Sequence, residues 1–173
     1  YVIPTTWFAN GISANYKPMD GLKLRVALLE DLNGEDVESG LRSARGKGYK
    51  TTAHDWTKNF SAEYTGLPGL RLGGSYTMNN APINDDPDTT ANIALLELHA
   101  KYVAHNIYAI FEYGNINYDG TNHTPSYKSS GEYYLDLGYN MASILNLKGK
   151  LMPWFRFSDY NRGTNDDGVL PSK

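Results

Sequence analysis

Charged side chains recur at alternate positions of several short segments of this chain, where they share one parity with small and polar residues. The basic members are Lys23, Arg25, Arg71, Lys101 and Arg156, and the acidic members are Glu63, Glu97, Glu112, Glu132 and Asp136. Charges along a water-filled wall set the local potential and hence the preference for passing ions. Alternatively, they pair across strands and only line a wetted wall. The two signs balance, so the set predicts no preference for anions or cations.

Metal binding and catalysis have little support in the sequence. His54, His99, His105 and His123 show no i, i+2 or i, i+4 pairing with one another. The acidic runs Asn84–Asp88 and Asn165–Gly168 could bind calcium, but neither has the EF-hand spacing, and solvated loops explain both. Nucleophile-elbow, phosphate-loop and dinucleotide-binding glycine motifs are absent, as is cysteine. We therefore expect no enzymatic activity, no metal and no cofactor.

The segments that carry the charges alternate between apolar and polar residues. In the stretch Gly131–Asn161, Leu135 and Leu137 share a parity with Tyr133 and Tyr139, which bracket them. Period-two alternation predicts strands with two unlike faces. A soluble sandwich would turn the apolar face inward, whereas an outer-membrane barrel turns it to lipid and lines its lumen with the polar face. The barrel interpretation predicts accessible side chains at Leu24, Leu72, Leu98, Phe111, Leu137 and Phe155.

The order of the connections favours a barrel. The alternation predicts strands over residues 8–17, 22–30, 56–64, 70–79, 92–104, 107–117, 132–142 and 150–159, within one segment that covers residues 1–173. The links 18–21, 65–69, 105–106 and 143–149 are short, and the links 30–55, 79–91 and 118–130 are long. Outer-membrane barrels have short periplasmic turns and long outer loops, a difference that Greek-key sandwiches and lipocalins do not require. The predicted fold class is all-β, an antiparallel up-and-down transmembrane β-barrel.

Aromatic residues are abundant enough to form belts at two membrane interfaces, with 14 tyrosines in 173 residues. The candidates on the lipid-facing parity are Phe8, Tyr16, Trp56, Tyr64, Tyr76, Tyr102, Tyr113, Tyr133, Tyr139 and Phe157. Lys58 breaks the pattern, because it shares its parity with Trp56 and Phe60. Near an interface its long side chain could reach the headgroups at little cost.

Composition excludes several other classes of protein. A net charge of -3 and a pI near 5.8 argue against nucleic-acid binding, which needs a basic patch. No apolar run approaches the roughly 18 residues of a transmembrane helix. The mean hydropathy of -0.51 is compatible with a barrel, in which lipid-facing and water-facing residues average out.

Several stretches resemble a known family. The opening IPTTWFANG, the NG, DG and PG turns, and GEYYLDLGYN followed by LMPWFRFSDYN resemble the outer-membrane porins typified by the phosphate-selective porins O and P. The resemblance implies a barrel of about sixteen strands, often assembled as homotrimers, in contact with lipid and lipopolysaccharide in the Gram-negative outer membrane. No N-terminal third of such a porin precedes Tyr1, and the chain ends in Pro171–Lys173 without a terminal aromatic residue. We therefore expect an internal fragment of about eight strands, and the basic ladder of a phosphate channel is not evident.

The expected function is passive diffusion of small hydrophilic solutes or ions through a porin channel. One alternative is a closed eight-stranded membrane anchor or adhesin whose lumen is filled by side chains. The small residues on the inward parity, Gly11, Ser13, Gly73, Ser75, Thr77 and Gly138, would not fill such a lumen, so the first and last strands should not pair. A second alternative is a soluble ligand-binding barrel, which would bury Leu24, Leu98 and Leu137.

Overall fold

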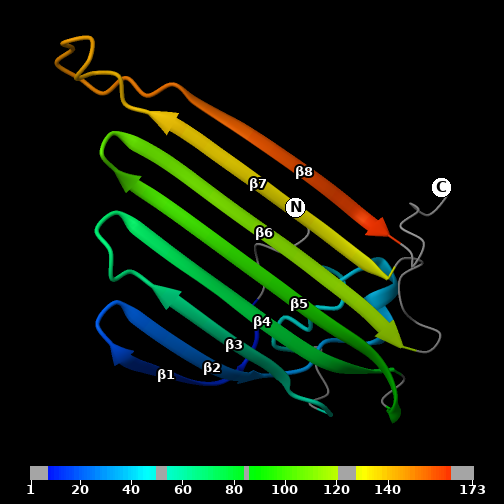
Figure 1. Cartoon of the computed structure of the whole chain (residues 1–173). Coiled ribbons are helices and arrows are strands. Elements are labelled where there is room, and N and C mark those ends of the chain that lie inside the picture. Colours follow the sequence, from blue (N-terminus) through cyan, green and yellow to red (C-terminus); the bar gives the residue numbers. More distant parts are fainter. Residues whose placement is uncertain (1–7, 50–53, 84–85, 121–127, 165–173) are drawn as a thin grey trace.

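The chain forms one antiparallel sheet of eight strands in the computed structural model, which describes residues 8–49, 54–83, 86–120 and 128–164 (Figure 1). The strands are β1 (Gly11–Met19), β2 (Leu22–Leu29), β3 (Thr57–Tyr64), β4 (Leu70–Ile83), β5 (Asp86–Ala104), β6 (Ile107–Gly120), β7 (Ser129–Tyr139) and β8 (Trp154–Thr164). Each strand pairs with its neighbours in the sequence, so the all-β, up-and-down part of the prediction is confirmed. Within the described ranges, no helix is long and apolar enough to cross a membrane.

The sheet is open, with β1 and β8 at its two edges. Neither strand pairs with the other over the residues that the structure describes, which confirms the expectation that the terminal strands do not close the sheet. Every residue of β1 is exposed. Each edge therefore presents backbone N–H and C=O groups that could pair with further strands.

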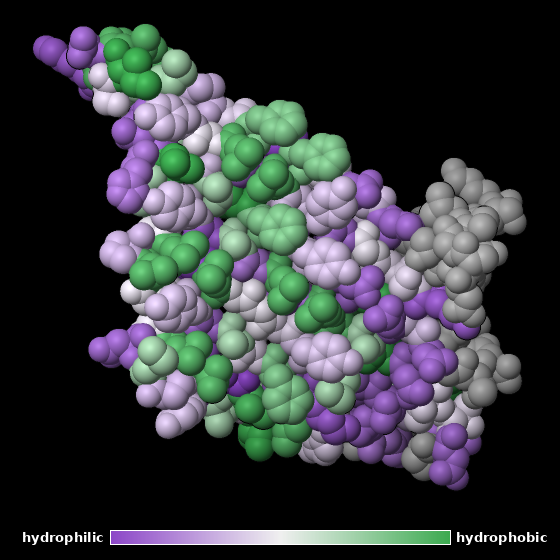
Figure 2. Space-filling view, in the orientation of Figure 1, coloured by the Kyte–Doolittle hydropathy of each residue, from purple (hydrophilic) through white to green (hydrophobic). Residues whose placement is uncertain are grey.

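The two faces of the sheet have opposite chemistry. We call the face that carries Leu24 and Leu98 the apolar face, and the face that carries Arg25 and Glu97 the polar face; the apolar face is the one seen in Figure 2. The register places Leu24, Ala62, Gly74 and Leu98 in one row, and Arg25, Ser61, Ser75 and Glu97 in the next. The side chains predicted to be accessible are exposed by 37% at Leu24, 41% at Leu72, 44% at Leu98, 40% at Phe111, 46% at Leu137 and 61% at Phe155. That prediction is confirmed.

The link predicted over residues 79–91 is mostly paired strand. β4 continues to Ile83 and β5 begins at Asp86, with Ala81 opposite Ala91 and Pro82 opposite Thr90. The acidic run and its proline predict a link in the sequence, whereas residues on both sides of the run are paired in the structure. The added strand residues are stable because Ala81, Ile83 and Ala91 are almost fully buried beneath the connection between β2 and β3.

Other boundaries also differ from the predicted ones. β1 begins at Gly11 and not at residue 8, β7 ends at Tyr139, and β8 begins at Trp154. The connection between β7 and β8 is therefore residues 140–153, longer than the short link predicted over residues 143–149. The strict alternation of short and long connections is wrong at this link and at the β4–β5 link.

The tight turn predicted at residues 105–106 is confirmed. His105 and Asn106 both have positive φ, at 51° and 63°, as a two-residue type I′ turn requires. This turn matches the right-handed twist of the flanking strands, and Tyr102 supports it through a 2.6 Å hydrogen bond between its hydroxyl and His105 Nδ1. The left-handed conformation costs a residue other than glycine roughly 1–2 kcal/mol.

Replacing Asn106 with glycine should therefore raise the free energy of unfolding, by about 0.5–1 kcal/mol, since asparagine already tolerates this conformation better than most residues. Urea unfolding in detergent micelles measures the change. The matched control is Asn117→Gly within β6, where the same substitution should lower the stability. Equal shifts of the same sign at both positions would contradict the turn assignment.

Candidate functional site

All ten charged residues predicted to line a pore lie on the polar face. The register pairs Lys23 with Glu63, Arg71 with Lys101, and Asp136 with Arg156. Glu97, Glu112 and Glu132 follow on β5, β6 and β7 and lie on the same face. The sheet therefore gathers residues far apart in the sequence onto one continuous charged surface.

The two signs are separated across this surface. Four exposed cations, Lys23, Arg25, Arg71 and Lys101, lie on β2, β4 and β5. The half-buried carboxylates Glu97, Glu112 and Glu132 lie on β5 to β7. Direct neutralisation is weak on the basic side, because Arg71 Nε lies 3.7 Å from Glu63 Oε2 between well-exposed side chains. The separation is partial, because Glu63 lies among the cations on β3 and Arg156 lies beyond the carboxylates on β8.

Asp136 and Arg156 form a bidentate ion pair between β7 and β8. Arg156 donates from Nε and Nη2 to the two carboxylate oxygens of Asp136, each at 2.6 Å. The guanidinium also stacks on Tyr134, 4.8 Å from its ring centroid, and lies 5.6 Å from the Trp154 ring. This pair joins β7 to β8. Because the Asp136 side chain is only 3% exposed, its carboxylate is little available to passing ions.

A second polar group surrounds His99. Its Nδ1 lies 2.5 Å from Glu97 Oε1, and Ser75 Oγ donates to the other oxygen of Glu97 at 3.3 Å. The imidazole covers Gly73, where an added Cβ would lie 2.5 Å from the ring. The sequence pattern places His99 and Glu97 on the polar parity of one strand, but the contact between them was not predicted. The signal was the i, i+2 spacing of Glu97 and His99, which puts both on one face of a strand.

The β2–β3 connection, predicted as a long link, folds against the polar face. It contains the 3₁₀-helix η1 (Glu35–Ser39), and its buried side chains Leu32, Val37, Leu41 and Ala44 pack on the sheet. Their partners are Ala81, Ile83, Ala91, Ile93, Leu95, Ile116 and Tyr118. We call this connection the inner loop. At the end of the polar face that carries Ile83 and Ile93, the side chains therefore form a buried hydrophobic core, whereas the rest of this face remains charged.

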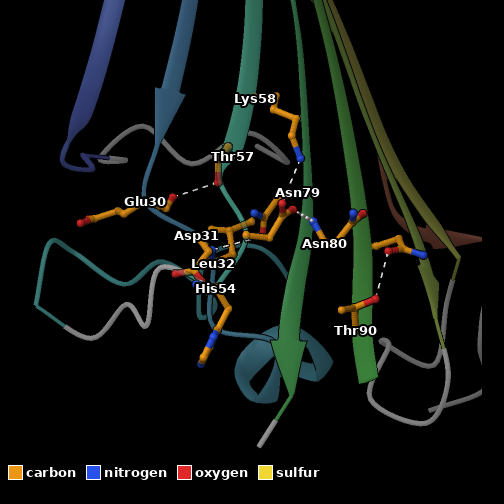
Figure 3. Close-up of polar contacts among 11 residues, drawn as sticks. Glu30, Asp31, Leu32, His54, Thr57, Lys58, Asn79, Asn80 and Thr90 are labelled. Carbon is orange, nitrogen blue, oxygen red and sulfur yellow. Dashed lines mark hydrogen bonds and ion pairs between the residues drawn. The ribbon is translucent and has the colours of Figure 1, made fainter. Parts of the chain in front are cut away.

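Polar contacts fix both ends of the inner loop (Figure 3). At its start, Thr57 Oγ1 donates to the carbonyl oxygen of Glu30 at 2.9 Å, and the Leu32 amide donates to Asn79 Oδ1 at 3.2 Å. The almost fully buried Asp31 accepts the His54 amide at 2.8 Å. At its end, Asp55 accepts the Asn80 amide at 3.0 Å and pairs with Lys58 at 3.0 Å. Lys58, which broke the predicted pattern, thus has a partner at the loop end of the sheet.

Four of the predicted belt residues form a slanted line across the apolar face. Tyr16, Tyr64, Tyr102 and Tyr139 lie near the ends of β1, β3, β5 and β7, towards the connections that follow β1, β3, β5 and β7. The register aligns each of the first three tyrosines with one residue two strands further on. The next tyrosine of the line lies two positions beyond that residue, towards the same end of the sheet. Those residues are Ala62 for Tyr16, Ala100 for Tyr64 and Leu137 for Tyr102.

The slope of this line has a geometric meaning. Two residues advance about 6.8 Å along a strand, and two strand spacings measure about 9.6 Å. A level plane through the tyrosines would therefore meet strands tilted by about 35° from its normal, which is the tilt of transmembrane β-strands. The turns of β1–β2, β3–β4 and β5–β6 follow the same slant in Figure 1.

The remaining belt candidates lie less regularly. Phe8, Trp56, Tyr76, Tyr133 and Phe157 are exposed, and Tyr113 is half-buried. Tyr76, Tyr113 and Tyr133 follow one another across β4, β6 and β7 on the apolar face, further from the short turns. They do not follow a line with the regular step of the other four tyrosines.

The candidate metal ligands are placed as ordinary polar residues. At the start of β5, Asp86 accepts hydrogen bonds from the Asp88 amide at 3.0 Å and the Thr89 hydroxyl at 2.9 Å. His105 stacks on Tyr102. Residues 84–85, His123 and the run 165–168 lie outside the described residues. Among the described ones, no group of three or more potential ligands could hold a metal ion.

The described residues thus form an open, up-and-down antiparallel sheet with one exposed apolar face and one charged face. No protein-family model and no curated protein sequence matches the chain. The resemblance to porins therefore stays a prediction.

The Asp136–Arg156 pair should contribute measurably to stability. A double-mutant cycle with Asp136→Asn and Arg156→Gln should give a coupling energy of about 1.5–3 kcal/mol, because the pair is bidentate and Asp136 is buried. Urea unfolding in micelles measures it. The matched control is the cycle of Glu63→Gln with Arg71→Gln, where the longer, exposed pair should give at most about 1 kcal/mol. Equal couplings would refute the distinction.

Proposed function

We propose that this chain is part of an outer-membrane channel through which small hydrophilic solutes or ions diffuse without chemical change. In this proposal the apolar face contacts membrane lipid and lipopolysaccharide, and the polar face lines a water-filled lumen. The sheet of eight strands is one portion of a larger barrel, as the resemblance to phosphate-selective porins implies. That resemblance also implies assembly as homotrimers.

The slanted line of tyrosines is the observation that carries the proposal. Amphipathic aromatic rings gather at membrane interfaces, and strands in a barrel must tilt by roughly 35–45°. In a soluble sheet, nothing requires tyrosines to step by two residues from one hairpin to the next. Figure 2 supports the same assignment, because apolar side chains extend across the strands on this face.

The open edges support a larger barrel. Unpaired backbone groups cost several kcal/mol each in hydrocarbon, so an inserted sheet needs partners at β1 and β8. A closed eight-stranded anchor would pair these two strands, and the described sheet leaves them apart. A soluble ligand-binding barrel would bury Leu24, Leu98 and Leu137, and all three are exposed.

The inner loop gives the proposed lumen a narrow region. It covers the polar face at the end of the sheet where β2 stops, and it is held by a hydrophobic cluster as well as by Asp31 and Asn79. A loop attached in this way reduces the cross-section open to solutes. The exposed cations and half-buried carboxylates nearer the short turns would then act on what passes.

Planar-bilayer recordings of the whole protein test the channel. We expect stepwise conductance, and its absence in membranes that contain the inserted protein would reject the channel. Asp31→Ala should make the open current larger or noisier, because the His54 amide loses its acceptor and the inner loop is held less firmly, by about 1–3 kcal/mol. Ser43→Ala is the matched control, since Ser43 lies exposed on the same loop. An unchanged current in Asp31→Ala would show that the loop does not limit flow.

Chemical labelling tests the orientation. The chain has no cysteine, so single cysteines can be introduced without background. In the proposed topology, a cysteine replacing Asp88 at the end of the β4–β5 hairpin faces the cell exterior, and one replacing Asp20 in the β1–β2 turn faces the periplasm. A membrane-impermeant maleimide applied to intact cells should label the first and spare the second. The reverse pattern would invert the topology.

A further inference from the structure

The connection between β7 and β8 ends in an exposed aliphatic tip. Ile144, Leu145 and Leu147 are 62%, 49% and 49% exposed. The connection extends beyond the β1–β2, β3–β4 and β5–β6 turns (Figure 1), and apolar side chains lie near its end (Figure 2). We call residues 140–153 the apolar-tip loop.

Hydrogen bonds order this loop without burying its tip. The Asn140 amide donates to the Asn106 carbonyl oxygen at 2.8 Å, and the Met141 amide donates to that of Leu151 at 2.8 Å. Nearer the tip, the amides of Ile144 and Leu145 donate to the Met141 carbonyl oxygen at 3.1 and 3.0 Å. These amides are therefore hydrogen-bonded, while the aliphatic side chains stay in contact with solvent at an unfavourable free energy.

The charges in the loop have one sign. Lys148 and Lys150 are both exposed, and residues 140–153 contain no aspartate or glutamate. Aliphatic side chains beside lysines fit the interfacial layer of a membrane, where apolar groups reach the acyl boundary and ammonium groups meet phosphates. A purely aqueous loop would not need the leucines.

The position of the loop agrees with that layer. Tyr139, the last tyrosine of the slanted line, lies at its base and donates its amide to the Pro153 carbonyl oxygen at 3.2 Å. An open apolar hollow of about 470 Å³ adjoins this base, with Ile107, Leu137 and Phe155 among its lining residues. The apolar face thus continues past the tyrosines into the loop. The interfacial layer beyond the hydrocarbon is about 5–7 Å thick on each side, which a tilted hairpin tip can occupy.

We propose that the apolar-tip loop is an anchor that binds the anionic phospholipid surface of the leaflet at the short-turn end of the sheet. Ile144, Leu145 and Leu147 enter the acyl boundary, and Lys148 and Lys150 bind lipid phosphates. This inference rests on the proposed membrane location of the sheet.

The test uses an environment-sensitive fluorophore on a cysteine that replaces Ser143, an exposed polar residue beside the tip. The full protein is inserted into vesicles of phosphatidylcholine, with or without phosphatidylglycerol. Nitroxide-labelled lipids should quench this probe, and more strongly in the anionic vesicles. Lys148→Gln and Lys150→Gln should each lower the docked-to-undocked ratio in anionic vesicles about fivefold. Replacing Ile144, Leu145 and Leu147 with serine should abolish lipid quenching.

Two reference probes separate this proposal from the function that it rests on. A probe on Leu98→Cys, in the apolar face, reports insertion of the sheet, and one on Asp20→Cys, in another turn at the same end, should be quenched by aqueous iodide. If lipids quench the Leu98 probe while iodide quenches the Ser143 probe, the anchor is rejected and the membrane sheet stands. A Ser143 probe protected from both quenchers would mean that a protein covers the tip, which also rejects the anchor. A Leu98 probe that lipids do not quench rejects both proposals.

Discussion

Backbone pairing in a fixed register is the constraint on which the rest of this structure depends. Side chains alternate between the two faces of a strand, so a slip of one residue would send Leu98 to the polar face and Glu97 to the apolar face. Tight turns pin the register. His105 and Asn106 adopt the positive φ values of a two-residue turn, and Gly21 and Gly69 supply positive φ in the turns before β2 and β4. In the β1–β2, β3–β4 and β5–β6 hairpins, the turn thus fixes which side chains of the two strands share a face.

The inner loop changes the chemistry of the polar face along its length. Glu97 and Leu95 are neighbours on the same face of β5, yet Glu97 lies in the charged surface whereas Leu95 is 4% exposed beneath the loop. Two effects together hold the inner loop on the sheet. Its apolar side chains are buried, and Asp31 and Asn79 accept hydrogen bonds from its amides. Neither would suffice, because a loop held by polar contacts alone would expose its leucines, and buried amides without acceptors would be costly.

The sequence predicted most of the sheet because period two is a strong local signal, as at Tyr133–Tyr139. It did not reveal how the inner loop packs. Val37, Leu41 and Ala44 have a helical spacing, but only the 3₁₀-helix η1 forms there, and the partners of these side chains are distant in the chain. A signal was nevertheless present: Ile93, Leu95 and Ile116 are apolar residues on the parity expected to face water. The pairing of Ala81 with Ala91 was missed for the same reason, because a strand next to an acidic run is stable only when the inner loop covers it. The separation of charge across strands needed the register as well as the residue types.

In the proposed channel, size and charge would be selected at different places on one surface. The inner loop occupies the end of the polar face that includes Ile93 and Leu95, and the exposed cations lie further along, at Lys101 and Arg71. A group that limits the cross-section must be rigid, and a buried hydrophobic cluster provides that rigidity. A group that attracts ions must stay hydrated and mobile, which exposed lysine and arginine side chains do. Because one region is dry and the other wet, the two requirements are met by separate residues, and either could change without disturbing the other.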